Sequence, residues 1–197
     1  MERSRKPLLV NINFAVKFLL VVLLFITSLS SDLSQLSGKG MGIRAVTYPI
    51  ALLIVPLIWR FRGKPKPYPH LVDILLVMPF LIDVAGNLAN FYNTIRRFDD
   101  IAHFANWALL TGAFGLALAR TPVGRLSRIT LTIGFGAITI ILWEIAESIL
   151  SFFGNSKLGL SYSDTIGDLA LSLGGSVLGA LLTYRVKARG KSPQSKT

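Results

Sequence analysis

The sequence predicts an all-α membrane protein: a polytopic helical bundle with about six transmembrane helices. Two observations predict this class. Of the 197 residues, 52% are hydrophobic, and the mean hydropathy of +0.57 is high for a water-soluble domain. The apolar residues are also gathered into runs about as long as the roughly 20 residues that a helix needs to cross a bilayer.

Six apolar runs follow one another with short polar or basic segments between them. We expect one membrane domain over residues 12–185, with polar motifs at 70–185, a basic cytoplasmic N-terminus at 1–11 and a basic, disordered tail at 186–197. The prolines in the second and third runs are tolerated in membrane helices. The runs cover residues 13–29, 42–59, 71–92, 98–119, 129–153 and 164–184.

The first run has two interpretations, which both stay open. It is either the first transmembrane helix, with Lys17 reaching toward the membrane interface, or part of a cleaved signal peptide. A basic start, an apolar run and then Ser28, Ser30 and Ser31 fit the second interpretation as well.

Basic residues lie mainly on one side of the predicted membrane. The net charge is +11, but the clustering in short loops and tails fits membrane topology, so we predict no nucleic-acid partner. The distribution predicts that both termini are cytoplasmic. The cytoplasmic set comprises 16 of the 21 basic residues: Arg3, Arg5, Lys6, Lys17, Arg60, Arg62, Lys64, Lys66, Arg120, Arg125, Arg128, Arg185, Lys187, Arg189, Lys191 and Lys196.

The fifth run carries two carboxylates at membrane depth, Glu144 and Glu147. They lie on one helix face because residues i and i+3 are neighbours. Each ionised side chain costs about 2.5–3.5 kcal/mol at the centre of a spanning helix. Other groups in the bundle should therefore meet this face.

Three other runs carry polar stripes. Asp83, Asn87 and Asn90 share a face of the third run, and Asp99, His103 and Asn106 share a face of the fourth, which also contains Asp100. The sixth run contains Asp164, Asp168 and Ser172 at spacings of four, followed by Gly175 and Gly179. This GxxxG permits close approach of another helix.

The predicted topology brings these stripes to one depth, near the outer surface. Runs three and five travel outward and carry their acids late, whereas runs four and six travel inward and carry theirs early. The inner halves contain few acids, with Asp73 as the exception. A polar vestibule, or simple polar packing with Asp164 as an N-cap, explains part of this pattern. Intramembrane ionisable residues nevertheless favour a functional site.

The composition excludes two kinds of site: the chain has no cysteine and only two histidines, which excludes thiolate chemistry and a His-rich metal centre. Three kinds of chemistry fit the predicted site. The first is binding of a divalent ion such as Mg, Mn, Fe or Zn. The second is a proton shared by Glu144 and Glu147 as catalytic groups, and the third is a cationic ligand head group. No residue is predicted for another cofactor. The candidate metal ligands are Asp99, His103, Glu144, Glu147 and Asp168, and the other polar-site residues are Asp83, Asn87, Asp100, Asn106 and Asp164.

The motifs of the last three runs resemble those of bacterial VanZ-like membrane proteins, and more closely those typified by YjdF. The positions that match the family pattern are Asp99, His103, Glu144, Asp168, Gly175 and Gly179. Asp100 stands where the pattern has Lys, Glu147 where it has Gln, and Ser172 where it has Asn, so this site is more acidic and metal binding is favoured. The resemblance implies a bacterial plasma (inner) membrane location. VanZ is linked to resistance to the glycopeptide teicoplanin, and this implies little about activity.

Three functions remain open from the sequence. One is metal-assisted chemistry on a lipid or cell-envelope precursor. The second is a transporter or a proton or cation pathway, although no line of acids continues through the inner half. The third is a non-catalytic envelope or binding protein. The lipid bilayer is the one partner that all three share.

Overall fold

The computed structural model describes residues 2–30, 32–65, 67–152, 161–184 and 186, and it confirms the predicted all-helical class. Six of its seven helices are long and apolar enough to cross a membrane, and the described residues contain no strand. The helices are α1 (Glu2–Leu29), α2 (Met41–Phe61), α3 (His70–Leu88), α4 (Phe91–Thr94), α5 (Phe98–Leu118), α6 (Arg125–Phe152) and α7 (Tyr162–Tyr184).

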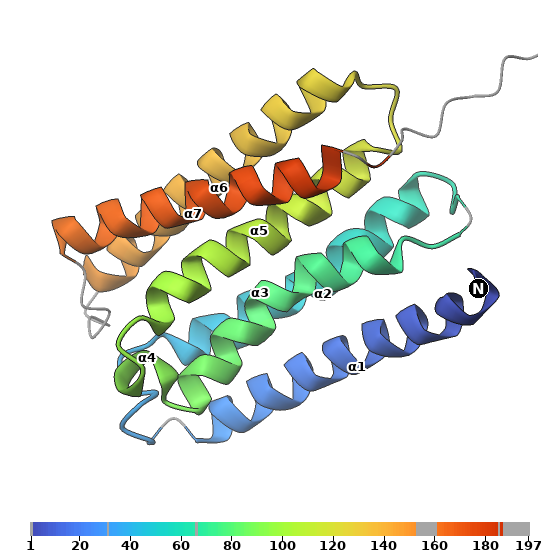
Figure 1. Cartoon of the computed structure of the whole chain (residues 1–197). Coiled ribbons are helices and arrows are strands. Elements are labelled where there is room, and N and C mark those ends of the chain that lie inside the picture. The colour runs from blue at the N-terminus through green and yellow to red at the C-terminus, as the bar shows by residue number, and fades with distance from the viewer. Residues whose placement is uncertain (1, 31, 66, 153–160, 185, 187–197) are drawn as a thin grey trace, which may run out of the picture.

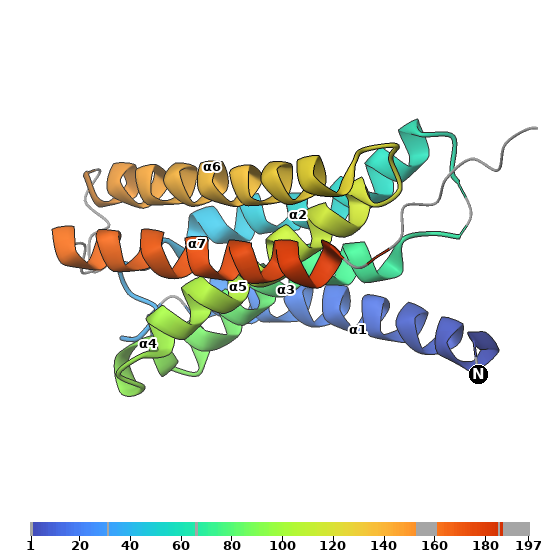
Figure 2. The same ribbon diagram turned by 45° about the horizontal axis from the view of Figure 1, so that its top comes forward.

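The long helices run up and down in one bundle (Figure 1). α3 lies between α1 and α5, and α7 packs along α5, while α6 covers α7 and α5 and α2 lies against α1 and α3. Figure 2 shows the same order from a view turned by 45°. The start of α1 and the α2–α3 and α5–α6 connections share one end, and α4 is at the other. We call these the terminal end and the α4 end.

The third predicted run was too long by four residues. α3 ends at Leu88, and Asn90 adopts the left-handed conformation with φ 62°, which asparagine tolerates better than most residues. The carbonyl of Asn90 accepts the backbone N–H groups of Asn93 and Thr94 and so opens the short α4. Asn90 therefore leaves the predicted stripe, while this turn brings Tyr92 back to Asp83.

Two other boundaries also differ. α1 begins at Glu2, continues through residue 11 and contains Pro7. α6 begins at Arg125, four residues before the predicted run. The domain limits at residues 11/12 and 185/186 stay a prediction, and 187–197 lie outside the described residues.

The GxxxG motif lies in the contact between α7 and α5. A Cβ on Gly175 would overlap the carbonyl oxygen of Phe104, and one on Gly179 would overlap the carbonyl oxygen of Ala108. Only glycine lets the two backbones approach this closely. The close approach that the motif permits is therefore found in the structure, and it holds α7 and α5 in a fixed register.

A polar network toward the terminal end joins α1 to α3. Asp73, whose side chain is fully buried, pairs with Lys17 at 2.6 Å and accepts hydrogen bonds from Asn13 at 3.0 Å and Tyr68 at 2.6 Å. Lys17 does not extend to the membrane interface as expected. A buried carboxylate needs a nearby cation, and this requirement outweighs hydration of the ammonium at the interface.

Candidate functional site

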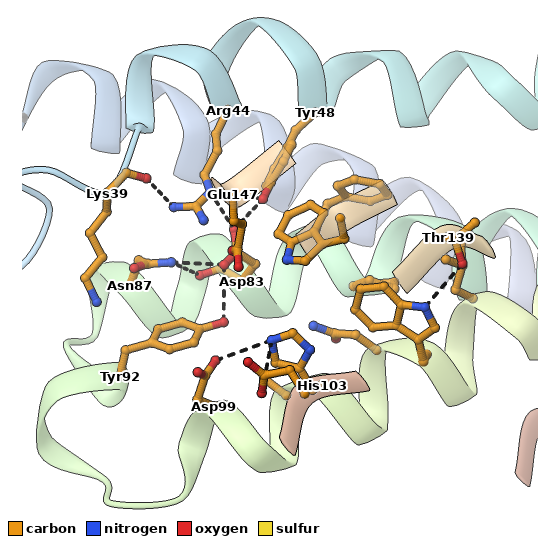
Figure 3. Close-up of a pocket in the computed structure, with 18 of the residues that line it drawn as sticks. Lys39, Arg44, Tyr48, Asp83, Asn87, Tyr92, Asp99, His103, Thr139 and Glu147 are labelled. Atoms are coloured by element: carbon orange, nitrogen blue, oxygen red, sulfur yellow. Dashed lines mark hydrogen bonds and ion pairs between the residues drawn. The ribbon is translucent and has the colours of Figure 1, made fainter. Parts of the chain in front are cut away.

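A polar cavity of about 380 Å³ lies toward the α4 end, with walls from α2 to α7 (Figure 3). The residues around it include five carboxylates, two cations, three amides and several aromatic rings. No described side chain of α1 is among the lining residues. The polar and ionisable lining consists of Lys39, Arg44, Tyr48, Asp83, Asn87, Tyr92, Asn93, Asp99, His103, Asn106, Trp107, Thr139, Trp143, Glu147, Asp164 and Asp168.

Asp83 is the centre of one side of the cavity. Its Oδ2 pairs with Arg44 Nε at 3.0 Å and accepts the Tyr48 hydroxyl at 2.6 Å. Its Oδ1 accepts Asn87 Nδ2 at 3.1 Å and the Tyr92 hydroxyl at 3.2 Å. Arg44 also donates to Tyr48 and to the carbonyl of Lys39. The charge of Asp83 is thus compensated within the protein.

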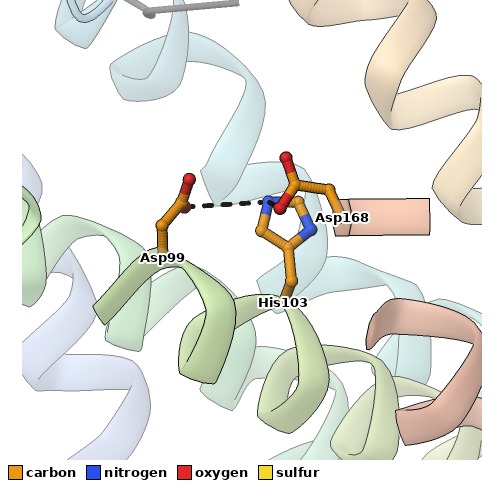
Figure 4. Close-up of side chains that lie close together, drawn as sticks. All are labelled: Asp99, His103 and Asp168. Carbon is orange, nitrogen blue, oxygen red and sulfur yellow. Dashed lines mark ion pairs between the residues drawn. The ribbon is translucent and has the colours of Figure 1, made fainter. Parts of the chain in front are cut away.

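Asp99, His103 and Asp168 form the opposite side (Figure 4). His103 Nε2 lies 3.7 Å from one oxygen of Asp99 and 3.7 Å from one oxygen of Asp168. One ligand atom from each residue lies within 4.8 Å of the other two, and His103 and Asp168 are buried. α5 supplies the first two residues at an i, i+4 spacing, and α7 supplies the third.

This geometry fits a divalent ion. Two atoms that bind one ion at about 2.1 Å lie roughly 3.0–3.4 Å apart in octahedral or tetrahedral coordination. The three ligand atoms lie within 4.8 Å of one another, and the two separations from His103 Nε2, 3.7 Å each, exceed this range by a few tenths of an ångström, which small side-chain rotations can close. These two separations are also too long for hydrogen bonds, so Nε2 is left available for a ligand bond. Two carboxylates and one imidazole suit Mn, Fe or Zn.

The His103 ring is held on its other edge and on one face. Nδ1 lies 3.2 Å from the Ser172 hydroxyl, so a proton on Nδ1 can be donated to Ser172 while Nε2 stays free. Trp107 stacks on the ring with an interplanar angle of 5°, and its own Nε1 donates to the Gly136 carbonyl and to Thr139. The imidazole is therefore oriented before any ligand binds.

The remaining predicted residues divide into two groups. Asp83, Asn87, Asn106, Glu147 and Asp164 line the cavity with the His103 group. Buried Asn106 Oδ1 has no hydrogen-bond partner among the described residues, which leaves one acceptor for a ligand or water.

Glu144 and Asp100 form the second group, because neither lines the cavity. Glu144 is 8% exposed, has a hydrogen bond with Thr165 of α7 and has one oxygen without a partner. Asp100 is exposed. Glu144 and Glu147 also lie outside the group of ligand atoms that Asp99, His103 and Asp168 make.

Several residues of the cavity were missed by sequence reasoning. The sequence offered a divalent ion, a shared proton or a cationic ligand as answers to excess acid, whereas in the structure Arg44 of the chain itself pairs with Asp83. Arg44 lies in the first turn of an apolar run, and a charge there was a usable signal that an acid must meet it. Lys39, Tyr48 and Tyr92 carried no such signal, because their role depends on which helices are neighbours.

Fold and cavity together define a six-span helical membrane protein with a partly enclosed, ionisable site. The model of the family described as "Predicted membrane protein (DUF2238)" matches residues 13–189, and the chain belongs to this family. No curated protein and no solved structure matches this chain.

Proposed function

We propose that this protein is a bacterial inner-membrane protein whose cavity, near the extracytoplasmic face, performs metal-assisted chemistry on a lipid or cell-envelope precursor. The observation that carries the proposal is the group formed by Asp99, His103 and Asp168. Their ligand atoms lie within 4.8 Å of one another and face a cavity large enough for part of a substrate. A divalent ion there would polarise a phosphoryl or carbonyl oxygen of the substrate.

Glu147 is the proposed acid–base group. It lines the cavity and has no hydrogen bond or ion pair with another described residue, so its carboxyl group is free to exchange a proton with a bound molecule. Arg44 lines the same cavity. We assign Glu144, which does not line the cavity and has a hydrogen bond with Thr165 of α7, to positioning α6 against α7.

The likeness to VanZ-like and YjdF-like proteins is part of this proposal. Asp99, His103 and Asp168 of the shared pattern meet at the cavity, and Gly175 and Gly179 lie in the helix contact that brings α7 to α5. This clustering supports a single site built from the motif residues of α5 and α7. Membership of a membrane-protein family supports the location in a bilayer but does not itself name an activity.

Metal content tests the proposal directly. The purified protein, loaded in turn with Mn²⁺, Fe²⁺ and Zn²⁺ and then desalted, should retain about one ion per chain, and His103→Ala should retain none. His70→Ala is the matched control, because His70 is the only other histidine and bonds to Asn13 outside the cavity. Equal metal in His103→Ala and the unchanged protein would refute the metal site.

The orientation of the protein in the membrane needs a separate measurement. Reporter fusions after Lys66, after Arg125 and at the C-terminus should be cytoplasmic, and fusions within 93–97 and 154–163 should be external, because most basic residues flank the terminal end. A cytoplasmic signal from the 93–97 fusion would place the cavity on the opposite side of the membrane.

A further inference from the structure

A second hollow, of about 260 Å³, lies between α2 and α6 beside the polar cavity. Lys39, Arg44, Tyr48, Trp143 and Glu147 line both spaces, so the two share a wall. The rest of the second lining is largely apolar and comes from the same two helices and the residue just before α2: Gly40, Ile43, Thr47, Ala146 and Leu150. We call this space the α2–α6 groove.

The groove faces the surroundings of the bundle. Although α2 and α6 both border the polar cavity, no Cα atom of α2 lies within 8 Å of one in α6 among the described residues. Ile43 and Ala146 are exposed on its two sides. Because both helices are apolar spans, the exposed sides contact lipid, and the groove opens sideways to the bilayer.

Lys39 marks the junction of the two spaces with a positive charge. It is partly buried, its ammonium lies 5.1 Å from the centre of the Tyr92 ring, and it forms no ion pair with a described residue. Burial, and then the neighbouring Arg44, lower the pKa of Lys39. An anionic group bound there would relieve this cost, whereas Arg44 is already engaged by Asp83.

Acids of the same cavity carry the other sign. Outside the proposed metal group, Glu147 and Asp164 line the cavity, and neither pairs with a lysine or arginine of the described chain. A ligand with an anion near Lys39 and a cation a few atoms further on would complement both sides. A phosphate linked to an amine has this arrangement, and acyl chains attached to the phosphate would suit the apolar groove.

We propose that a zwitterionic phospholipid with a primary amine enters the polar cavity sideways between α2 and α6. Its phosphate binds Lys39, its ammonium group lies by Glu147 and Asp164, which leaves Asp99 and Asp168 to the metal, and its acyl chains occupy the α2–α6 groove. This inference rests on the proposed function, because it names the substrate class of the same cavity.

Native mass spectrometry of the full-length protein in mild detergent tests the head-group part. Phosphatidylethanolamine, phosphatidylglycerol and phosphatidylcholine are added singly at equal concentration. Phosphatidylethanolamine adducts should dominate, because only its compact ammonium can donate hydrogen bonds to the acids while its phosphate binds Lys39. Lys39→Gln should weaken them about tenfold, the scale of one charge-assisted hydrogen bond, and Lys39→Arg should retain most of them. Arg96→Gln, an exposed cation at the same end, should change nothing.

A second pair of variants tests the route. Ala146→Phe should fill the groove and remove most adducts, whereas Ala170→Phe adds the same ring to an exposed position of α7 outside the groove. Equal adducts with all three lipids, or equal losses in the two alanine variants, would overturn the inference. If Lys39→Gln cannot be purified, the alanine pair decides.

The two proposals fail in different ways. His103→Ala should lose the metal and keep phosphatidylethanolamine, whereas Lys39→Gln should keep the metal and lose the lipid. If no metal binds but the Lys39 and Ala146 effects are found, the metal-assisted function fails and the lipid site stands. If metal binds stoichiometrically but no lipid is preferred, the lipid site fails.

Discussion

Two buried aspartates on the same helix, Asp73 and Asp83, have similar partners but different surroundings. Each pairs with one cation from a neighbouring helix, Lys17 or Arg44, and each accepts a tyrosine hydroxyl at 2.6 Å. Neither Asp73 nor its partners line the polar cavity, whereas Asp83 and its cation do. The first network fastens α1 to α3, and the second forms one wall of a site. A buried ion pair by itself therefore does not identify a functional residue.

The largest expected loss of stability follows from breaking the Asp73 network. Lys17→Met should destabilise the protein by about 3–5 kcal/mol, because it leaves a buried carboxylate without its cation. Arg44→Met should cost less, since Asp83 keeps three hydrogen bonds and borders a cavity that admits water. Thermal unfolding in detergent measures both. Adding Asp73→Asn to Lys17→Met should restore much of the loss, and a greater cost for Arg44→Met would reverse the comparison.

This result also bears on the first helix. If residues up to Ser31 were cleaved as a signal peptide, Asp73 would lose Lys17 and Asn13 together. The stability of the mature protein would then be insensitive to Lys17→Met. N-terminal sequencing of the purified protein gives an independent answer.

Removal of the metal should cause the second largest loss of stability. A divalent ion at 100 times its dissociation constant stabilises the folded protein by about 2.7 kcal/mol. A chelator should therefore lower the unfolding temperature of the unchanged protein and leave Asp168→Asn unaffected. Lys17→Met should keep its full response to chelator, because its network is remote from the site. A chelator without effect on the metal-loaded, unchanged protein would favour a shared proton over a metal.

Replacement of single glycines should show that the contact between α5 and α7 also holds the metal site together. Gly175→Ala should cost about 1–3 kcal/mol, because the added methyl group would overlap the backbone of α5. It should also weaken metal binding, since the same contact brings Asp168 to His103. Gly167→Ala is the matched control on α7, because its Cβ would meet nothing within 4 Å. Equal unfolding temperatures for the two variants would show that the contact is not tight.

Glu147→Gln should have the smallest effect on stability. Glu147 makes no hydrogen bond or ion pair with another described residue, so the variant should lie within about 0.5 kcal/mol of the unchanged protein. Its metal content should also stay the same, because Glu147 is outside the ligand group. Loss of metal from Glu147→Gln would return this residue to the ligand set, and thermal unfolding with metal analysis checks both outcomes.

The polar stripes show how far local patterns predicted the site. Asp99 and His103 were paired from their i, i+4 spacing, and the structure places them on one face of α5. Glu144 and Glu147 were paired by the same kind of spacing, yet only Glu147 lines the cavity. Adjacent positions on a helix face differ by up to about 60° in direction, and the packing of α7 decides which of them faces the cavity.

The sequence by itself determined the class, the approximate spans and the stripes, because hydrophobic run length and helical periodicity are local properties of the chain. Tertiary structure alone decided which stripes meet. Arg44 reaches Asp83 because α2 lies against α3, and Asp168 reaches His103 because two glycines let α7 approach α5. Contacts between helices depend on side-chain volumes and backbone separations far apart in the sequence, which no local pattern contains.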